Sequence, residues 1–199
     1  MPKIVDHEDR MRCIAGAAIH VIGKSGIEGM RLRDVAKAAD VTTGAVTHYF
    51  DGKDAVLEAA LDEVVRRMLA MQRDAQATGD GFVGAAASFM PNSEAQRRDW
   101  RVWFAFWGRA MSDRRLRAKH RTAYAAFSAN TLAGVREMQK RGLADPKTDA
   151  RAMADALIAV TDGLGIRVSL EPEDWPLERQ KKTLRVAIEP ILRGTNGRK

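Results

Sequence analysis

Residues 30–53 read MRLRDVAKAADVTTGAVTHYFDGK, and this stretch decides the fold of the N-terminal part of the chain. Apolar residues recur at helical spacing on both sides of Asp40, which predicts one short helix over about 33–39 and a second over about 43–49. Val35, Ala36 and Val46 supply small contacts that let two helices cross closely at a tight turn. The stretch therefore predicts a helix-turn-helix unit.

The second of these helices offers an outer face of short or flat side chains, namely Thr43, Gly44, Ala45, Thr47 and His48. A helix that reads DNA must enter a major groove about 12 Å wide, so bulky side chains would hold it away from the base edges. The amide groups at a helix N-terminus also attract phosphate. These features indicate binding to double-stranded DNA.

The rest of the chain shows helical spacing almost throughout, whereas the two-residue alternation of strands does not persist. We therefore expect an all-α fold of about nine helices, with a three-helix N-terminal head followed by a larger helical domain. Gly26 is expected to end the first helix, Gly84 to interrupt helical structure and Pro146 to open a later helix. Other helices are expected over about 53–78, 94–111 (capped by Asn92 or Ser93), 116–138 and 184–192.

The composition is that of a folded globular protein: 199 residues, of which 45% are hydrophobic and 30% charged. No apolar run approaches the roughly 20 residues that span a membrane, and the charged N-terminal residues do not resemble a signal peptide. We expect a cytoplasmic protein with no membrane partner. Cys13 is the only cysteine, which excludes an intramolecular disulfide and a multi-cysteine metal site, so we expect neither a metal nor a cofactor.

The net charge of +7 is unevenly distributed. Residues 1–53 contain 8 Lys or Arg and 7 Asp or Glu, whereas residues 97–121 contain 9 and 2. On charge alone the second region would bind a polyanion. A helical run of arginines is more often a solvated face, which is the interpretation we favour. The alternative is a basic helical module that binds RNA or an acidic protein.

The pattern A-x-V-x-x-G-x-x-x-x-Y-F-x-x-K also runs through the first stretch, at Ala39, Val41, Gly44, Tyr49, Phe50 and Lys53. It resembles the DNA-binding domain of the TetR family of repressors, and the resemblance extends to chain length and helix order. The resemblance implies a helix-turn-helix DNA-binding domain over residues 1–52 and a helical ligand-binding and dimerisation domain over residues 53–199. It also implies a homodimer that pairs through the last two helices.

Carried onto this sequence, the resemblance implies that Thr42 or Thr43 caps the second helix of the pair. The residues expected to contact DNA are Arg31, Arg33, Thr42, Thr43, Gly44, Thr47, His48, Tyr49 and Lys53. The chain departs from the family pattern at Asp40, where glycine is usual, so Asp40 must adopt a tight-turn conformation. It departs again at Thr47, where tyrosine is usual, and at Arg31, where threonine is frequent.

Three of the four tryptophans lie within residues 100–107. They form a core helix or a ligand site, because aromatic faces also attract quaternary ammonium groups. The patterns W-x-A-F-W over 103–107 and A-x-x-D-G-L-x-x-R over 159–167 resemble the choline- and betaine-responsive repressors of the TetR family, which control glycine-betaine synthesis from choline. The expected ligand-binding residues are Trp103, Phe104, Trp107, Tyr124 and Asp162. Gly165 stands where a large aromatic residue would complete a cage.

These observations favour a ligand-responsive dimeric repressor that binds a palindromic DNA operator and is released by a small-molecule effector. The resemblance implies choline, betaine aldehyde or a related quaternary ammonium compound as the effector. The alternative is a repressor of the same family for an unrelated hydrophobic or cationic effector, for example one controlling an efflux pump or a catabolic operon. An enzyme is disfavoured, because the histidines lie in different predicted helices and the common catalytic motifs are absent.

Overall fold

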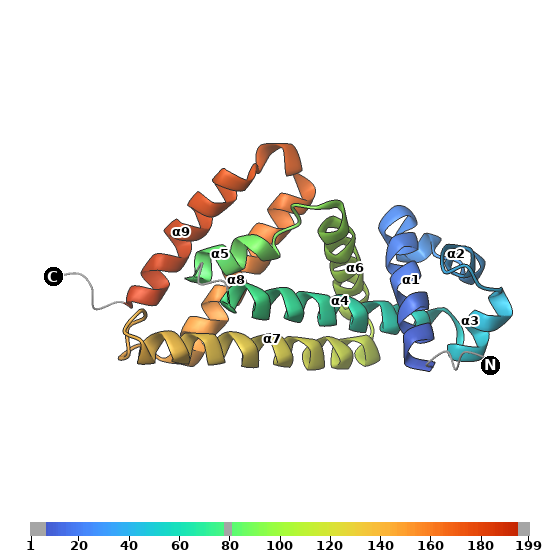
Figure 1. The fold of residues 1–199 in the computed structure, drawn as a ribbon, viewed down its shortest axis with the longest axis horizontal. Coiled ribbons are helices and arrows are strands. Elements are labelled where there is room, and N and C mark those ends of the chain that lie inside the picture. Colours follow the sequence, from blue (N-terminus) through green and yellow to red (C-terminus); the bar gives the residue numbers. More distant parts are fainter. Residues whose placement is uncertain (1–6, 78–80, 195–199) are drawn as a thin grey trace. The chain divides into compact units, whose positions relative to one another are not determined.

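The computed structural model describes residues 7–77 and 81–194, and within these ranges it contains helices and no strand (Figure 1). This confirms the predicted all-α class. The α-helices are α1 (His7–Gly29), α2 (Leu32–Ala38), α3 (Thr43–Tyr49), α4 (Gly52–Ala77), α5 (Gly81–Phe89), α6 (Glu94–Ala110), α7 (Arg114–Lys140), α8 (Ala150–Leu170) and α9 (Leu177–Arg193), with a 3₁₀ turn η1 (Pro172–Asp174) before α9.

The chain divides into two compact units, each with its own internal packing. Unit 1 comprises Met1–Arg67 and Ser93–Ala118, so it contains α1, α2, α3, the first part of α4 and α6. Unit 2 comprises Met68–Asn92 and Lys119–Lys199, so it contains α5, most of α7, α8 and α9. The predicted domain boundary between residues 52 and 53 is a functional division, and it stays a prediction.

The core of unit 1 forms around α1, which presents Ile14, Ala18 and Ile22 to its neighbours at helical spacing. All three are almost fully buried. Helix α1 packs against both α2 and α6. Gly26 leaves the helical conformation at φ 70°, where the sequence predicted an end, and one further helical turn follows as far as Gly29. Glycine tolerates this left-handed conformation without the steric penalty of a side chain.

In unit 2, α9 packs against both α5 and α8. Two local predictions fail here. Gly84 lies inside α5 and does not interrupt it, because one glycine costs a helix only about 1 kcal/mol and three alanines follow it. Helix α8 begins at Ala150 and not near Pro146, because the Asp149 carboxylate accepts hydrogen bonds from the amides of Arg151 and Ala152 and so caps the helix.

Candidate DNA-binding and effector sites

Helices α2 and α3 form the predicted helix-turn-helix pair, and they pack on each other in unit 1. Val35 and Val46 are fully buried at this contact. The turn between them closes through a hydrogen bond from the Val41 amide to the Ala36 carbonyl, 3.0 Å long. Asp40 has φ 53°, so it adopts the tight-turn conformation that its place in the sequence requires.

Helix α3 begins directly after Thr42, which is one of the two residues that the resemblance implies as its cap. The Thr42 hydroxyl accepts a hydrogen bond of 3.1 Å from the Ala45 amide. The Thr47 hydroxyl donates to the carbonyls of Thr43 and Gly44, at 3.3 and 3.1 Å. Because its proton is used within the helix, the Thr47 hydroxyl offers an outside partner only its oxygen lone pairs and its methyl group.

The outer face of α3 is open to solvent. Within α3 and its cap, five of the residues predicted to contact DNA are exposed, namely Thr42, Thr43, Gly44, Thr47 and His48, whereas Val46 points inward. Tyr49 is half-buried, and its ring contacts the imidazole rings of His7 and His48 with centroids 4.8 and 5.2 Å away. The helix therefore has one polar face free for a partner and one apolar face in the core.

Two of the basic residues predicted to contact DNA, Lys53 and Arg33, also contact other groups of the chain. Lys53 Nζ donates to the Glu28 carbonyl at 3.1 Å, which joins the start of α4 to the end of α1. Arg33 lies 3.7 Å from the Asp34 carboxylate, and Arg31 is exposed. Phosphate contacts by Arg31, Arg33 and Lys53 stay predictions.

The five residues predicted for the effector fall into two sets. Trp103, Phe104 and Trp107 lie on α6 in unit 1, and the Trp107 ring contacts those of Trp103 and Phe104 at 5.8 and 5.6 Å. Trp103 is buried, and the other two are half-buried. Tyr124 and Asp162 lie in unit 2, where the Tyr124 hydroxyl donates a hydrogen bond to Asp162 Oδ2.

Asp162 is a carboxylate in a poorly solvated position. Burial raises its pKa to about 6, although the hydrogen bond from Tyr124 works in the opposite direction. Burial also raises the pKa of Tyr124, with the nearby Asp162 charge adding to the effect. The His120 ring lies 4.5 Å from the Tyr124 ring, and burial lowers the His120 pKa, so this imidazole is neutral at pH 7.

Comparison with known proteins identifies the family. Residues 14–60 match the family model for bacterial regulatory proteins, tetR family, and residues 80–193 match the model for the C-terminal part of BetI-type transcriptional repressors. The HTH-type transcriptional regulator BetI of Paraburkholderia phytofirmans is 31% identical and aligns over 96% of each chain. That of Burkholderia lata is 32% identical over 85% of this chain and 87% of its own. The chain belongs to the TetR family of transcriptional regulators.

Solved structures of transcriptional regulators share the fold. A transcriptional regulator from Rhodococcus sp. Rha1 is 30% identical, with a TM-score of 0.77 over 92% of this chain and 95% of that one. A regulator from Saccharomonospora viridis, solved in complex with choline, has the same TM-score at 23% identity over 92% and 96% of the two chains. The TetR-family assignment makes this protein a DNA-binding repressor and not an enzyme. No helix in the described part of the chain is long and apolar enough to cross a membrane.

In this TetR-family protein, much of the basic run over residues 97–121 is engaged within unit 1. Glu94 lies within 4 Å of three arginines, and Asp54 and Glu58 of α4 pair with two more. Arg117 donates to the carbonyls of Ala110 and Met111, which ends α6. The five paired residues are Arg97, Arg98, Arg101, Arg109 and Arg115. These internal contacts favour a structural role over a polyanion site.

A buried charge network joins α4 to α6 in unit 1, and sequence reasoning did not find it. Arg67 pairs with Glu63 at 2.8 Å and with Asp99 at 3.3 Å, and both carboxylates are less than a tenth exposed. Burial raises the pKa of Asp99. Burial acts in the same direction on Glu63, but hydrogen bonds from Arg66 and Arg67 outweigh it and lower the Glu63 pKa. The signal in the sequence is an acidic residue placed between Arg98 and Arg101, at Asp99.

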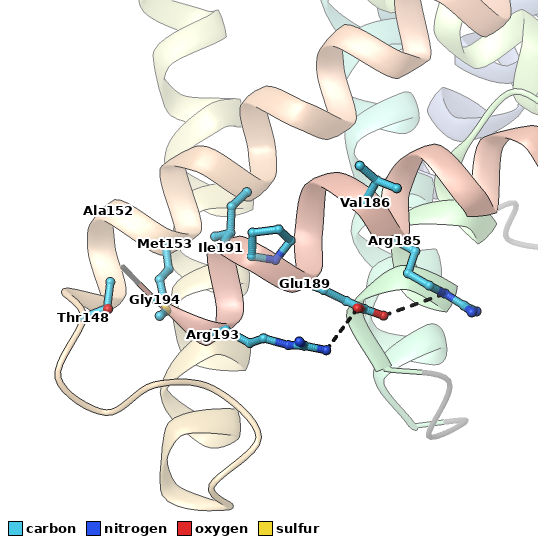
Figure 2. A pocket seen from close by; sticks show the side chains of 10 residues that line it. Thr148, Ala152, Met153, Arg185, Val186, Glu189, Ile191, Arg193 and Gly194 are labelled. Atoms are coloured by element: carbon cyan, nitrogen blue, oxygen red, sulfur yellow. Dashed lines mark hydrogen bonds and ion pairs between the residues drawn. The ribbon is translucent and has the colours of Figure 1, made fainter. Parts of the chain in front are cut away.

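A surface groove of about 840 Å³ lies in unit 2 between the N-terminal part of α8 and the C-terminal part of α9 (Figure 2). Met153, Val186 and Ile191 give it an apolar floor, and Glu189 pairs with both Arg185 and Arg193 along its edge. None of the five residues predicted for the effector lines it. The groove therefore belongs to the α8–α9 surface and not to the predicted effector site.

Proposed function

We propose that this TetR-family repressor is a homodimer that binds a palindromic operator through α3 and is released by a small cationic effector of the quaternary ammonium class. The observation that carries the proposal is the Tyr124–Asp162 pair, a poorly solvated carboxylate with a raised pKa. A permanent cation is the kind of ligand that such a carboxylate favours. Choline and betaine aldehyde are the first compounds to test.

The aromatic residues of α6 support the same class of effector. Trp103, Phe104 and Trp107 form a chain of ring contacts, and indole faces attract quaternary ammonium groups. The choline complex of the regulator from Saccharomonospora viridis gives a precedent within this fold. A hydrophobic or differently charged effector is the alternative, and the assay described below separates the two.

The dimer is proposed to form through α8 and α9. Both helices expose large apolar side chains: Ile166 and Leu170 on α8 are 37% and 74% exposed, and Leu177 and Val186 on α9 are 43% and 70% exposed. Exposed apolar groups gathered on neighbouring helices are typical of an interface. A second copy would also place two α3 helices for half-sites about 34–36 Å apart.

The effector is tested by titrating choline while tryptophan fluorescence and operator binding are followed together. The matched control is 3,3-dimethylbutanol, which has nearly the shape of choline but no charge. We expect choline to change the fluorescence and to release DNA, and the neutral analogue to do neither at the same concentration. Equal responses to both compounds would favour the hydrophobic alternative.

The role of α3 is tested by selecting duplexes from a random pool and then measuring a Gly44→Ala variant. A methyl group at Gly44 meets no other protein atom closer than the Thr42 hydroxyl at 3.8 Å, so the fold accommodates it. If the α3 backbone approaches DNA at Gly44, the variant binds the selected palindrome about tenfold more weakly while its melting temperature is unchanged or higher. Unchanged DNA affinity would move the contact surface away from Gly44.

A further inference from the structure

His7 is the first residue of α1 in the described structure and lies outside the helix-turn-helix pair. Its ring nevertheless contacts the ring of Tyr49, the last residue of α3, with centroids 4.8 Å apart and planes tilted by 59°. His48 contacts the same tyrosine at 5.2 Å. The end of the proposed recognition helix is therefore joined by a side chain from α1.

The imidazole of His7 is available to a partner. The residue is exposed, and its ring nitrogens have no hydrogen-bond partner among the described residues. A neutral imidazole carries one N–H in either tautomer, so it donates a hydrogen bond without needing to be protonated. The packing on Tyr49 restrains the ring, so less conformational entropy is lost when a partner binds.

We propose that His7 is a further DNA-contacting residue, whose imidazole N–H donates to a phosphate oxygen beside the position that Tyr49 contacts. Phosphates recur at about 3.4 Å of helix axis along each strand, so a donor packed against Tyr49 has an acceptor within reach. This inference rests on the proposed role of α3 and Tyr49 in DNA binding. It adds the first turn of α1 to the binding surface.

Two features of the structure weigh against a phosphate contact by His7, and the experiment must address both. Glu8 and Asp9 are acidic residues that repel phosphate, although Asp9 is paired with Arg12. The ring contact also has a simpler consequence, which is to hold Tyr49 in place without touching DNA. A phosphate contact carries no sequence information, so its loss weakens binding to every duplex by the same factor.

The experiment compares His7→Ala, His7→Phe and His7→Gln, with His20→Ala as the matched control on the same helix. Phenylalanine keeps a ring against Tyr49 but has no donor, and glutamine keeps a donor. His20 is also exposed, and it lies more than three helical turns further along α1. Affinity is measured for the selected palindrome and for a scrambled duplex of the same length, and circular dichroism checks that each variant is folded.

We expect His7→Ala and His7→Phe each to bind both duplexes about tenfold more weakly, with His7→Gln close to the parent and His20→Ala unchanged. Parent-like binding by His7→Phe would overturn the proposal, because the ring would then only support Tyr49. A loss confined to the palindrome would also overturn it, because that result indicates base contact. Failure of the unmodified chain to select any duplex would instead count against the proposed function.

Discussion

Two poorly solvated aspartates of this protein, the buried Asp99 and the half-buried Asp162, have different partners. Asp99 in unit 1 has a resident cation, because Arg67 lies 3.3 Å from its carboxylate and also pairs with Glu63. Asp162 in unit 2 has the hydroxyl of Tyr124 as its hydrogen-bond donor, and no Lys or Arg of the described residues forms an ion pair with it. Burial raises the pKa of both carboxyls. The difference indicates that Asp99 serves the packing of α4 and α6, whereas Asp162 suits a cation from outside.

Arg67→Ala removes the cation that pairs with Asp99, and it should give the largest loss of stability. The buried Asp99 carboxylate would then lose its ion-pair partner, and the nearby Glu63 would keep only the more exposed Arg66, which costs about 3 kcal/mol in the free energy of unfolding. We take the low end of the usual range because the Arg67 side chain is 36% exposed, so water screens part of the interaction. Urea denaturation followed by circular dichroism measures the change.

Arg66→Ala is the matched control for that experiment. Arg66 pairs with the same Glu63 at 2.7 Å, but its side chain is 58% exposed and it does not pair with Asp99. Its loss is expected to cost under about 1 kcal/mol. Equal costs for the two arginines would show that Asp99 does not depend on Arg67.

The Asp162→Asn variant tests the other aspartate. If Asp162 pairs with a bound cation, as proposed, removing its charge is expected to weaken choline binding at least about 30-fold. The same change removes a desolvation cost, so the melting temperature should stay the same or rise. Isothermal titration and thermal melting give the two measurements. Unchanged choline affinity in a folded variant would show that Asp162 is not the counter-charge.

The proposed role of Asp162 is also tested by varying the pH of the choline titration. With a pKa of about 6, Asp162 is ionised at pH 7.5 and largely protonated at pH 5. Choline keeps its charge throughout, so its binding should weaken about tenfold between these two pH values. The decrease for Asp162→Asn should be smaller over the same range, and His120 beside Tyr124 is a second group that gains charge as pH falls. A parent profile without this decrease would contradict the assignment of the effector charge to Asp162.

Ionisation of Asp162 should affect stability in the opposite direction from choline binding, because it favours binding but disfavours folding. Because its pKa is higher in the folded chain than the ordinary value of 3.8, the folded state binds the proton more tightly. The Asp162 contribution therefore favours folding most at low pH and declines as pH rises from about 4 to about 6. The parent protein should lose this part of its stability over that window, while Asp162→Asn should not.

The two units also differ in how much of their local structure could be predicted from the sequence. The span of α3 and its cap were readable in advance, because a helix of seven residues depends on local signals such as Thr42 and the buried Val46. The positive φ of Asp40 followed from its place in a family pattern. The predictions at Gly84 and Pro146 are wrong for local reasons. The alanines that follow Gly84 keep α5 helical, and the Asp149 cap sets the start of α8 after Pro146.

Contacts between residues far apart in the sequence could not be predicted, for a different reason. Arg67 and Asp99 are 32 residues apart, and helical periodicity fixes a face of each helix but not the helix that it meets. The sequence predicts that the arginines of residues 97–121 form a solvated face. In the structure, five of them pair with acidic side chains in unit 1. The contact of His7 with Tyr49 likewise gives no sign in the sequence, because α1 and α3 are separated by α2.

Asp99→Asn is expected to change the stability of the folded chain only slightly. Asparagine keeps an oxygen that accepts from Arg67, and Arg67 still pairs with Glu63, so no buried charge is left alone. The change also removes a carboxylate whose ionised form burial and the Glu63 charge disfavour, so the free energy of unfolding at pH 7 should change by less than about 1 kcal/mol. Any gain should be larger at pH 7 than at pH 4, because a raised pKa makes the parent carboxylate costly only when it is ionised. Urea denaturation at the two pH values measures this, and a loss as large as that of Arg67→Ala would mean that the Asp99 charge, and not its hydrogen bond, holds α6 to α4.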